Sequence, residues 1–314
     1  MVDVSIVIVC MNNLGNLYPC LDSILRYTKV TYEVIVVAFM FSKDNLKRLQ
    51  IDYPWIKIII SNELRGFSEN NNIALREACG KYCFIVNDDT FFHHSVIDIL
   101  VSTIENLPAN VAIVSPVILN KDGSIQRNGK CEYNKFTYLL QLFKLKEWYN
   151  KRSKYVNQQG IYKTYNISGA CFLIKTDIFR NVGWFDERYY FCPEDIALST
   201  KLNKKGFQCY VNTDARIVHI QGGTWSKIQA ATMPAAEKGN FIFYTDGSTW
   251  FKYIYILLSK FTHSLSGILW YIKYCMYKDK KSKIKYKAHF NTVQTIANHE
   301  TPKELFVRLY SQLR

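Results

Sequence analysis

Hydrophobic and polar positions alternate in blocks over the first 120 residues. Five short apolar runs, rich in β-branched residues, lie at 4–9, 33–37, 56–60, 82–86 and 111–117. Helix-length stretches separate them, at 16–27, 43–50, 68–79 and 95–106. Near-continuous apolar strands belong to sheets that are covered on both faces. The alternation therefore predicts an α/β fold with a mainly parallel, doubly wound sheet and right-handed crossovers.

The alternation of strand and helix patterns does not continue over residues 121–165, where the chain becomes polar, basic and aromatic. We interpret that stretch as an excursion over the sheet. Regular elements are expected again as a strand at 168–174, a helix from Asp177, a helix from Glu194 to about Lys204, and closing strands at 209–211 and 216–219. Ser68 and Gly80 are the expected N-cap and stop of the helix at 68–79.

The chain changes character near its C-terminal end. Residues 250–277 are aromatic and aliphatic, but Lys252, Lys260 and Lys273 interrupt them, so they make a poor transmembrane span. Residues 273–287 contain seven lysines and one aspartate. An amphipathic stretch followed by a lysine cluster is typical of a membrane-surface anchor. A helical dimer interface and a cover for the core are the alternatives.

Charge supports a division of the chain into two parts. Of the net charge of +14, residues 241–314 carry +8, from 12 Lys/Arg and 4 Asp/Glu. We predict a catalytic body at 1–240, with a nucleotide-binding half at 1–120 and an acceptor-binding half at 121–240, followed by a helical basic extension at 241–314. An anionic membrane surface is the expected partner of the extension. Nucleic acid is disfavoured, because no recognised nucleic-acid motif accompanies the lysines.

Cysteine usage and the N-terminus bear on the compartment. The nine cysteines are odd in number and scattered, and none forms a C-x-x-C pair, so neither a disulfide framework nor a zinc ribbon is indicated. The first residues lack the basic region and cleavage site of a signal peptide, and the run at 4–9 is too short to span a bilayer. We therefore expect a protein of the reducing cytosol.

Candidate chemistry begins with Asn87-Asp88-Asp89-Thr90, directly after the apolar run at 82–86. In open α/β sheets, ligands bind at the carboxyl ends of the strands. Paired carboxylates there suit a hard divalent cation, which in turn suits the phosphates of a nucleotide. Taken alone, such a stretch is more often a solvated turn.

Four segments in the same order resemble the inverting family-2 glycosyltransferases, whose nucleotide-sugar fold is called GT-A. Residues 4–13 resemble their opening strand, Arg65-Gly66-Phe67 with Asn71-Asn72 resembles G-F-x-x-x-N-N, residues 86–90 resemble L-N-P-D-T, and residues 183–195 are similar to G-G-F-D-E-x-F-F-x-Y-x-E-D. His219 lies about where these enzymes place a further histidine. The most similar subset is bacterial, rhamnosyltransferase-like, and builds O-antigen, capsule and related polysaccharides.

The resemblance implies roles for the matching positions. Asp89 and His219 would hold a Mg²⁺ or Mn²⁺ ion against the donor diphosphate, and Asp195 would be the base that deprotonates the acceptor hydroxyl. The residues that would frame the donor nucleotide-sugar are Asn12, Gly66, Phe67, Asn71 and Asp88. Asp88 would be an outer metal ligand or simply solvated. The structural alternatives are a histidine without a ligand at position 219 and a helix-capping role for Glu194-Asp195, which is compatible with catalysis.

Two departures from the family pattern matter. The family's second strand usually ends in an aspartate that contacts the base, but Ala38 stands here, so base selectivity is relaxed, rebuilt with a residue such as Asp44, or lost in an inactive paralogue. Ala197 stands where some members carry another acid. The place of a Gly-rich phosphate loop holds residues 11–15 instead, which argues against an enzyme that makes nucleotide sugars. Residues 221–225 are expected to form a lid over the diphosphate.

These observations together predict a metal-dependent inverting glycosyltransferase. It would move a sugar from a UDP- or dTDP-type donor to a glycan or lipid-linked acceptor in surface polysaccharide biosynthesis. The expected location is the inner face of the cell membrane, with the protein peripherally associated. A catalytically inactive nucleotide-sugar-binding paralogue is the main alternative, and a basic nucleic-acid-binding protein is a weaker one.

Overall fold

The computed structural model describes residues 2–126, 129–143, 145–156, 158–220 and 228–313. The chain divides into two compact units. The first comprises Met1–Glu132, Lys146–Asp186 and Asp195–Gln221, and the second comprises Tyr133–Leu145, Glu187–Glu194 and Gly222–Arg314. The division thus falls near residue 221, earlier than the expected 240, because the helix that follows it packs with the C-terminal helices. Two short segments of the expected body also belong to the second unit.

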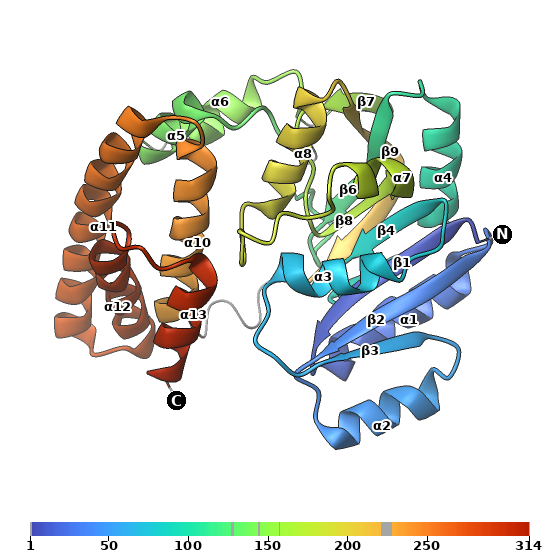
Figure 1. Cartoon of the computed structure of the whole chain (residues 1–314), viewed down its shortest axis with the longest axis horizontal. Helices are drawn as coiled ribbons and strands as arrows, with labels where there is room; N and C mark the ends of the chain where they lie inside the picture. The colour runs from blue at the N-terminus through green and yellow to red at the C-terminus, as the bar shows by residue number, and fades with distance from the viewer. Residues whose placement is uncertain (1, 127–128, 144, 157, 221–227, 314) are drawn as a thin grey trace. The chain divides into compact units, whose positions relative to one another are not determined.

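A nine-stranded sheet forms the centre of the first unit in its described residues (Figure 1). The strands are β1 (Val4–Met11), β2 (Tyr32–Phe39), β3 (Lys57–Ser61), β4 (Tyr82–Val86), β5 (Thr90–Phe91), β6 (Val111–Leu119), β7 (Ile161–Thr164), β8 (Cys171–Lys175) and β9 (Gln208–His219). Their order is β3-β2-β1-β4-β8-β6-β9-β5, with β7 also paired to β9. The five N-terminal strands expected from the apolar runs are confirmed as β1, β2, β3, β4 and β6.

The sheet is parallel in one half and mixed in the other. β3, β2, β1 and β4 pair with one another in parallel, as predicted. β8 runs antiparallel to both of its neighbours, β4 and β6, whereas β6 and β9 are parallel. Parallel neighbours need crossover connections, which the regular strand–helix alternation of the first 90 residues supplies. β6 is the last strand of the alternation that the sequence shows over its first 120 residues, but it pairs with β8 and β9 in the mixed half.

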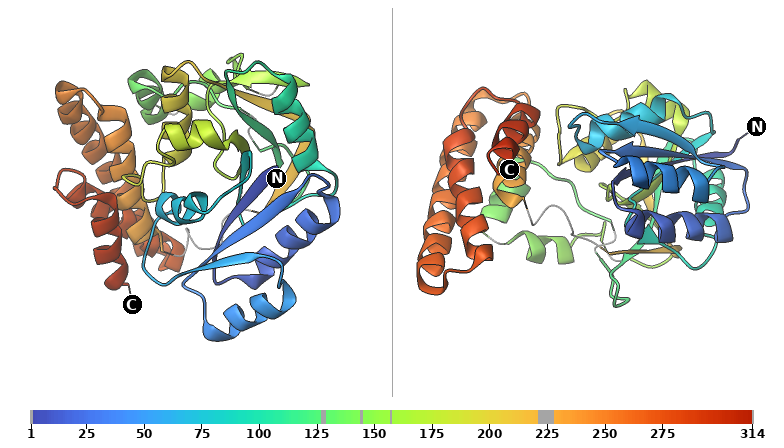
Figure 2. Two further views of the ribbon diagram at one scale, coloured as in Figure 1. Left: turned by 45° about the vertical axis from the view of Figure 1, so that its right-hand side comes forward. Right: turned by 90° about the horizontal axis from the view of Figure 1, so that it is seen from below.

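Helices cover both faces of this sheet, as the doubly wound prediction requires (Figure 2). On one face lie α1 (Leu14–Tyr27), α2 (Lys43–Asp52) and α4 (Val96–Asn106), and on the other lie α3 (Phe67–Arg76), α7 (Thr176–Asn181) and α8 (Glu194–Lys204). Successive side chains of a strand point to opposite faces. Ile6 and Ile8 therefore pack with α1, while Val7 between them packs in the cluster of α3 and α8.

The structure corrects three local expectations. The third helix begins one residue after Gly66, which is its N-cap in place of Ser68, and it ends at Arg76 before reaching Gly80. The excursion at 121–165 contains regular elements, namely α5 (Lys135–Leu142), α6 (Lys146–Lys151) and β7. The two closing strands are a single strand, β9, because β6 and β7 pair along its length.

The second unit is helical. Its long helices are α10 (Gln229–Thr245), α11 (Thr249–Tyr277), α12 (Lys280–Thr295) and α13 (Pro302–Ser311), and α5 joins them. Tyr138 of α5 stacks on Tyr255 of α11 with ring centroids 4.3 Å apart, and Leu305 and Phe306 of α13 pack with Ala231 of α10. No helix in the described ranges is long and apolar enough to cross a membrane.

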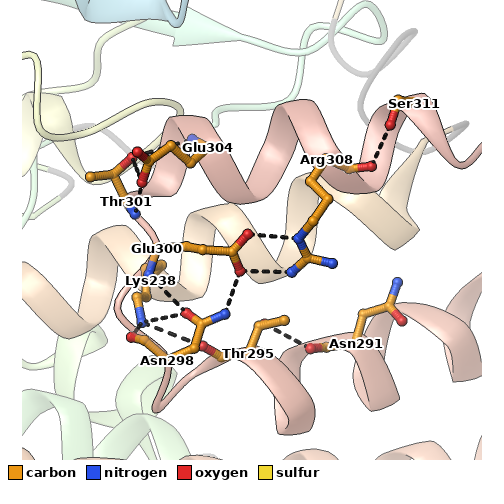
Figure 3. Close-up of polar contacts among 9 residues, drawn as sticks. All are labelled: Lys238, Asn291, Thr295, Asn298, Glu300, Thr301, Glu304, Arg308 and Ser311. Carbon is orange, nitrogen blue, oxygen red and sulfur yellow. Dashed lines mark hydrogen bonds and ion pairs between the residues drawn. The ribbon is translucent and has the colours of Figure 1, made fainter.

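A buried lysine ties the helices of this unit together. The ammonium group of Lys238 in α10 lies among oxygens of Thr295 and Asn298, at the end of α12 and beyond it (Figure 3). It also donates to the carbonyl of Ile296, at 3.1 Å. Burial lowers the pKa of Lys238, and the charge of Glu300 opposes that effect. Glu300 in turn forms a two-pronged ion pair with Arg308 of α13, at 2.6 and 2.7 Å. One lysine thus connects α10 to the turn between α12 and α13.

A histidine pair between α11 and α12 predicts a pH dependence of stability. The Nδ1 atoms of His263 and His289 lie 3.1 Å apart. Burial lowers the pKa of both to about 4, and for His289 the charges of His263 and Lys285 lower it further. An unfolded histidine titrates near 6.5, so below that pH protons bind the unfolded chain before they bind the buried pair. The free energy of unfolding is therefore at its full value above pH 6.5 and falls as the pH decreases toward 4.

We expect the free energy of unfolding of the second unit to fall by about 3 kcal/mol between pH 7 and pH 4.5 through these histidines. Urea unfolding followed by circular dichroism at several pH values measures it. His263→Gln with His289→Gln should flatten the profile, whereas the matched variant His299→Gln, at an exposed position of the same unit, should not. Equal pH profiles for all three proteins would contradict the assignment.

Candidate active site

The pairing of two strands brings Asp89 to His219. β5 runs antiparallel to β9, with Thr90 opposite His219, and the N–H of Ile220 donates to the carbonyl of Asp89 at 3.0 Å. Nε2 of His219 consequently lies 3.2 Å from Oδ1 of Asp89. Nδ2 of Asn87 approaches the same nitrogen at 3.4 Å. The two residues expected to share a metal ion are thus in direct contact.

Gln126 holds the imidazole of His219 from the other side. Its Nε2 donates to the His219 carbonyl at 2.9 Å, and its Oε1 lies 3.3 Å from Nδ1 of His219. A proton on Nδ1 would satisfy that oxygen and leave the lone pair of Nε2 directed at the Asp89 carboxylate. Two such acceptors in contact require a proton or a metal ion between them.

The donor set at this position fits a divalent metal. A carboxylate oxygen and an imidazole nitrogen suit Mn²⁺, and Mg²⁺ is commonly held by one or two carboxylates together with substrate phosphates and water. Within the described ranges, no three His, Cys, Asp or Glu side chains cluster to hold a metal ion. Asp89 and His219 would therefore be the protein's share of a coordination shell that substrate oxygens complete.

Asp88 is shielded from solvent beside this pair. Burial raises its pKa to about 6, hydrogen bonding with the Cys10 thiol opposes the shift, and the neighbouring charge of Asp89 adds to it. This partial burial disfavours a simply solvated carboxylate for Asp88, and the role of an outer metal ligand stays a prediction. Its carboxylate faces the end of β1, where Cys10 lies.

Asp195 lies in the first turn of α8 and is held by three donors. Its Oδ2 accepts from the N–H of Gly169 at 2.9 Å and from the ammonium group of Lys130 at 3.0 Å. Its Oδ1 accepts from the N–H of Ile196 at 2.7 Å. The side chains of Lys130 and Asp195 are 19% and 15% exposed. The carboxylate is thus fixed in orientation and still reaches solvent, as a base that meets an acceptor must.

Lys130 is itself fixed by its backbone. Its N–H donates to Oγ1 of Thr164 at 2.9 Å, and its carbonyl accepts from the N–H of Asn166 at 3.0 Å. Gly129 before it has φ +65°, and a Cβ there would lie 2.3 Å from the carbonyl oxygen of Tyr155. Only glycine allows this close approach, which sets the position from which Lys130 reaches Asp195.

The excursion therefore contributes two residues that the sequence analysis missed, Gln126 beside His219 and Lys130 beside Asp195. No motif marked either residue, because both lie in a polar segment without periodicity. In the sequence, Gly129-Lys130 indicates a turn at most. Its relation to the site is evident only from the contacts with Tyr155 and Asp195.

Two of the residues expected at the nucleotide serve the local structure. Oδ1 of Asn12 accepts from the N–H of Ser42 and from Nδ2 of Asn45, both at 3.0 Å, so this side chain fixes the start of α2. Asn71 is buried, and its Nδ2 donates to the carbonyl of Phe67 at 2.9 Å. Their polar groups shape the edge of the sheet, and the expected contact with a nucleotide stays a prediction.

Gly66 and Phe67 begin α3 at the end of β3. The N–H of Gly66 donates to Oε2 of Glu69 at 3.1 Å, and the ring of Phe67 meets that of Phe185 edge-on at 5.6 Å. Asn72, which the sequence analysis gave no role, binds both backbone groups of Phe185, at 2.9 and 3.1 Å. The glycine–phenylalanine segment and the segment at 183–195 are therefore connected by one buried amide.

Ala38 is completely buried in β2, where it pairs with Cys10 and Ile60. Its methyl group offers no hydrogen-bond acceptor to a nucleotide base. Asp44, the suggested replacement, is exposed in the first turn of α2. The expected lid at 221–225 lies outside the described residues.

Comparison with known proteins supports the resemblance. The model of the family described as glycosyl transferase family 2 matches residues 5–183. An N-acetylglucosaminyl-diphospho-decaprenol L-rhamnosyltransferase of Mycobacterium tuberculosis is 32% identical over 87 residues, which are 27% of this chain and 28% of that protein. The O-antigen biosynthesis protein RfbC of Myxococcus xanthus is 23% identical over 226 residues, 70% of this chain and 17% of that protein. The matches thus span less than a third of either relative.

The fold is shared with a solved structure, the crystal structure of GalNAc-T7 with UDP, GalNAc and Mn²⁺. The TM-score is 0.56 at 16% sequence identity, and the match covers 75% of this chain and 51% of that one. This likeness confirms the predicted GT-A fold.

Gly129→Ala is expected to destabilise the first unit by several kcal/mol, because the new methyl group would meet a backbone carbonyl in a conformation that already disfavours side chains. Gly123→Ala is the matched control. Gly123 also has a left-handed φ, +80°, but nothing lies within 4 Å of its Cβ position, so its cost should be about 1 kcal/mol. Thermal unfolding of both variants measures the difference, and equal losses would mean that the close approach at Gly129 is unimportant.

Proposed function

Because this chain belongs to glycosyl transferase family 2, we propose that it transfers a sugar from a nucleoside-diphosphate donor to a glycan or lipid-linked acceptor, with inversion at the anomeric carbon. The observation that carries the proposal is that one unit holds both a fixed carboxylate, Asp195, and a pair of acceptors in contact, Asp89 and His219, that could share a metal ion. Both are surrounded by donors and acceptors that set their orientation.

Asp195 is the proposed general base. It would accept the proton of an acceptor hydroxyl lying within about 2.6–3.2 Å, as that oxygen attacks the anomeric carbon from the side opposite the diphosphate. A single in-line displacement inverts the configuration and needs one carboxylate only. Lys130 and the N–H of Gly169 hold Oδ2 in place.

Asp89 and His219 are the proposed ligands of Mg²⁺ or Mn²⁺. Such an ion would neutralise the charge that develops on the departing diphosphate. Gln126 would keep the Nε2 lone pair of His219 directed at the ion. Asp88 would add negative charge beside the pair, as an outer ligand.

Similar proteins support a coarse choice of substrates. The solved relative in fold was crystallised with UDP and Mn²⁺, and the mycobacterial relative is named for a rhamnosyl transfer to a diphospho-decaprenol lipid. We propose a UDP- or dTDP-type donor, a lipid-linked acceptor, a place in surface polysaccharide biosynthesis, and a location at the inner face of the cell membrane. The buried Ala38 favours one alternative, an inactive protein that binds nucleotide sugar without turnover.

Release of nucleoside diphosphate from UDP-, dTDP- and GDP-sugars, with Mg²⁺ or Mn²⁺, tests the reaction class. We expect release from one donor, its loss on chelation of the metal, and a decrease of about 10²–10⁴-fold in Asp195→Asn. Asp89→Ala should abolish the metal dependence together with most of the activity. Asp177→Asn is the matched control, since Asp177 also lies in the first turn of a helix and accepts from the following N–H, at 2.8 Å.

Donor binding measured by calorimetry separates the two candidates. Binding of a nucleotide sugar without release in the presence of acceptor lipid would favour the inactive relative. Absence of binding for every donor, in a folded protein, would refute both.

Lys130→Met should lower kcat by roughly 10–100-fold and leave the KM for the donor nearly unchanged, because it loosens the base without touching the nucleotide. Lys130→Arg, which keeps the positive charge, should recover part of the activity. Steady-state kinetics of the three proteins measure the effect. An increase confined to the donor KM, with kcat unchanged, would show that Lys130 acts on the nucleotide instead of on Asp195.

A further inference from the structure

α11 carries an apolar face that no part of the described structure covers. Eight large side chains recur along it at intervals of three or four residues and are between 38% and 69% exposed: Trp250, Ile254, Leu257, Phe261, Leu265, Ile268, Ile272 and Met276. At 100° per residue they fall within a sector of about 100°, and they span about 39 Å of helix. We call them the α11 stripe. Contiguous exposed apolar surface of this extent marks an interaction site.

The buried side of α11 faces its own unit. Phe251, Tyr255, Ser259 and Gly267 are buried. α11 packs against α10 and α12 and, through Tyr255, against Tyr138 of α5. Tyr255 and Ser259 donate to the carboxylate of Glu237 in α10, at 2.8 and 3.0 Å. These contacts fix the rotation of the helix, so the stripe is held on the outside.

The surroundings of the stripe are positively charged. Residues 247–299 contain nine lysines, no arginine and a single acidic residue, Asp279. Eight of these lysines are exposed: Lys252, Lys260, Lys273, Lys278, Lys280, Lys281, Lys283 and Lys287. None of the charged residues interrupts the stripe itself. Lys260 and Lys273 lie to either side of it, whereas Lys252 lies on the opposite side of the helix.

We propose that the α11 stripe docks on the surface of a bilayer that contains anionic lipids, with α11 lying in the membrane plane and the lysines against phosphate headgroups. The proposal extends the membrane location suggested above for the transferase. An apolar face bordered by lysines is the pattern of helices that lie at the interface. Aromatic residues such as Trp250 and Tyr253 favour the same depth in the interface, because their rings have one apolar and one polar end.

The charge around the α11 stripe favours a membrane over a second copy of the chain as its occupant. A twofold dimer through the stripe would bring the same surface of both copies together. Its lysine borders would then face lysines, whereas helices that pair in this way use opposite charges at their borders. With one aspartate in residues 247–299, this part of the chain supplies no negative charges to face the lysines. Anionic lipid headgroups supply them.

Co-sedimentation of the full chain with vesicles tests the proposal. We expect binding to phosphatidylcholine vesicles with 30% phosphatidylglycerol, much weaker binding to pure phosphatidylcholine, and a decrease with salt. Leu257→Ser with Phe261→Ser and Ile268→Ser should weaken binding at least about tenfold. Lys280→Gln with Lys281→Gln and Lys283→Gln should weaken it on the order of a hundredfold, at about fivefold per lysine.

A matched control replaces three apolar residues of the first unit that are at least half exposed, by Leu25→Ser, Ile51→Ser and Ile60→Ser. It should bind vesicles as the unchanged protein does. Point substitutions are preferable to removal of the C-terminal segment, because α13 shares a buried core with α10.

Two outcomes would overturn the proposal. One is equal vesicle binding by the stripe variant and the unchanged protein. The other is a dimer in analytical ultracentrifugation that the stripe variant loses, without binding of the unchanged protein to anionic vesicles. Vesicle binding is measured without donor, and donor hydrolysis without vesicles, so failure of the docking surface and failure of the proposed transfer are separate results.

Discussion

The pairing of β9 with three other strands is the constraint on which the candidate site depends. Its twelve residues run parallel to β6, antiparallel to β7 and antiparallel to the short β5. The contact with β5 places His219 against Asp89. The contact with β7 fixes Thr164, which holds the backbone of Lys130 and so the ammonium group beside Asp195. One strand therefore sets both halves of the chemistry.

The two carboxylates of the site, Asp195 and Asp89, have different neighbours. Asp195 is surrounded by donors, namely two backbone N–H groups and an ammonium group, which restrict its movement. Asp89 and His219 present acceptors to each other, which a proton or a metal ion between them reconciles. A fixed carboxylate and a pair that could hold a metal ion are what the proposed transfer from a diphosphate leaving group would require of a protein.

The two units differ in how they use charge. In the first unit, the side chains of His219 and Asp195 are partnered by Gln126 and Lys130. In the second unit, Lys238 is buried among carbonyl oxygens and connects the helices, while most lysines of residues 247–299 are exposed. The buried charge contributes to folding, and the exposed charges support the proposed docking surface.

The sequence by itself determined the elements with a strong period and the residues that stand in motifs. Runs such as 82–86 read as buried strands because β-branched residues pack on both faces of a sheet. Asp89, Asp195 and His219 could be named because they stand at positions that match the motifs of family-2 glycosyltransferases. The tertiary structure alone decided which distant residues assist them. Gln126 and Lys130 lie in a segment without periodicity, and their partners are 93 and 65 residues away. Likewise, the apolar residues of α11 look alike in sequence, and only the packing of Tyr255 and Ser259 shows which of them remain outside. Local pattern fixes conformation, whereas side-chain partnership over long separations depends on the packing of the whole unit.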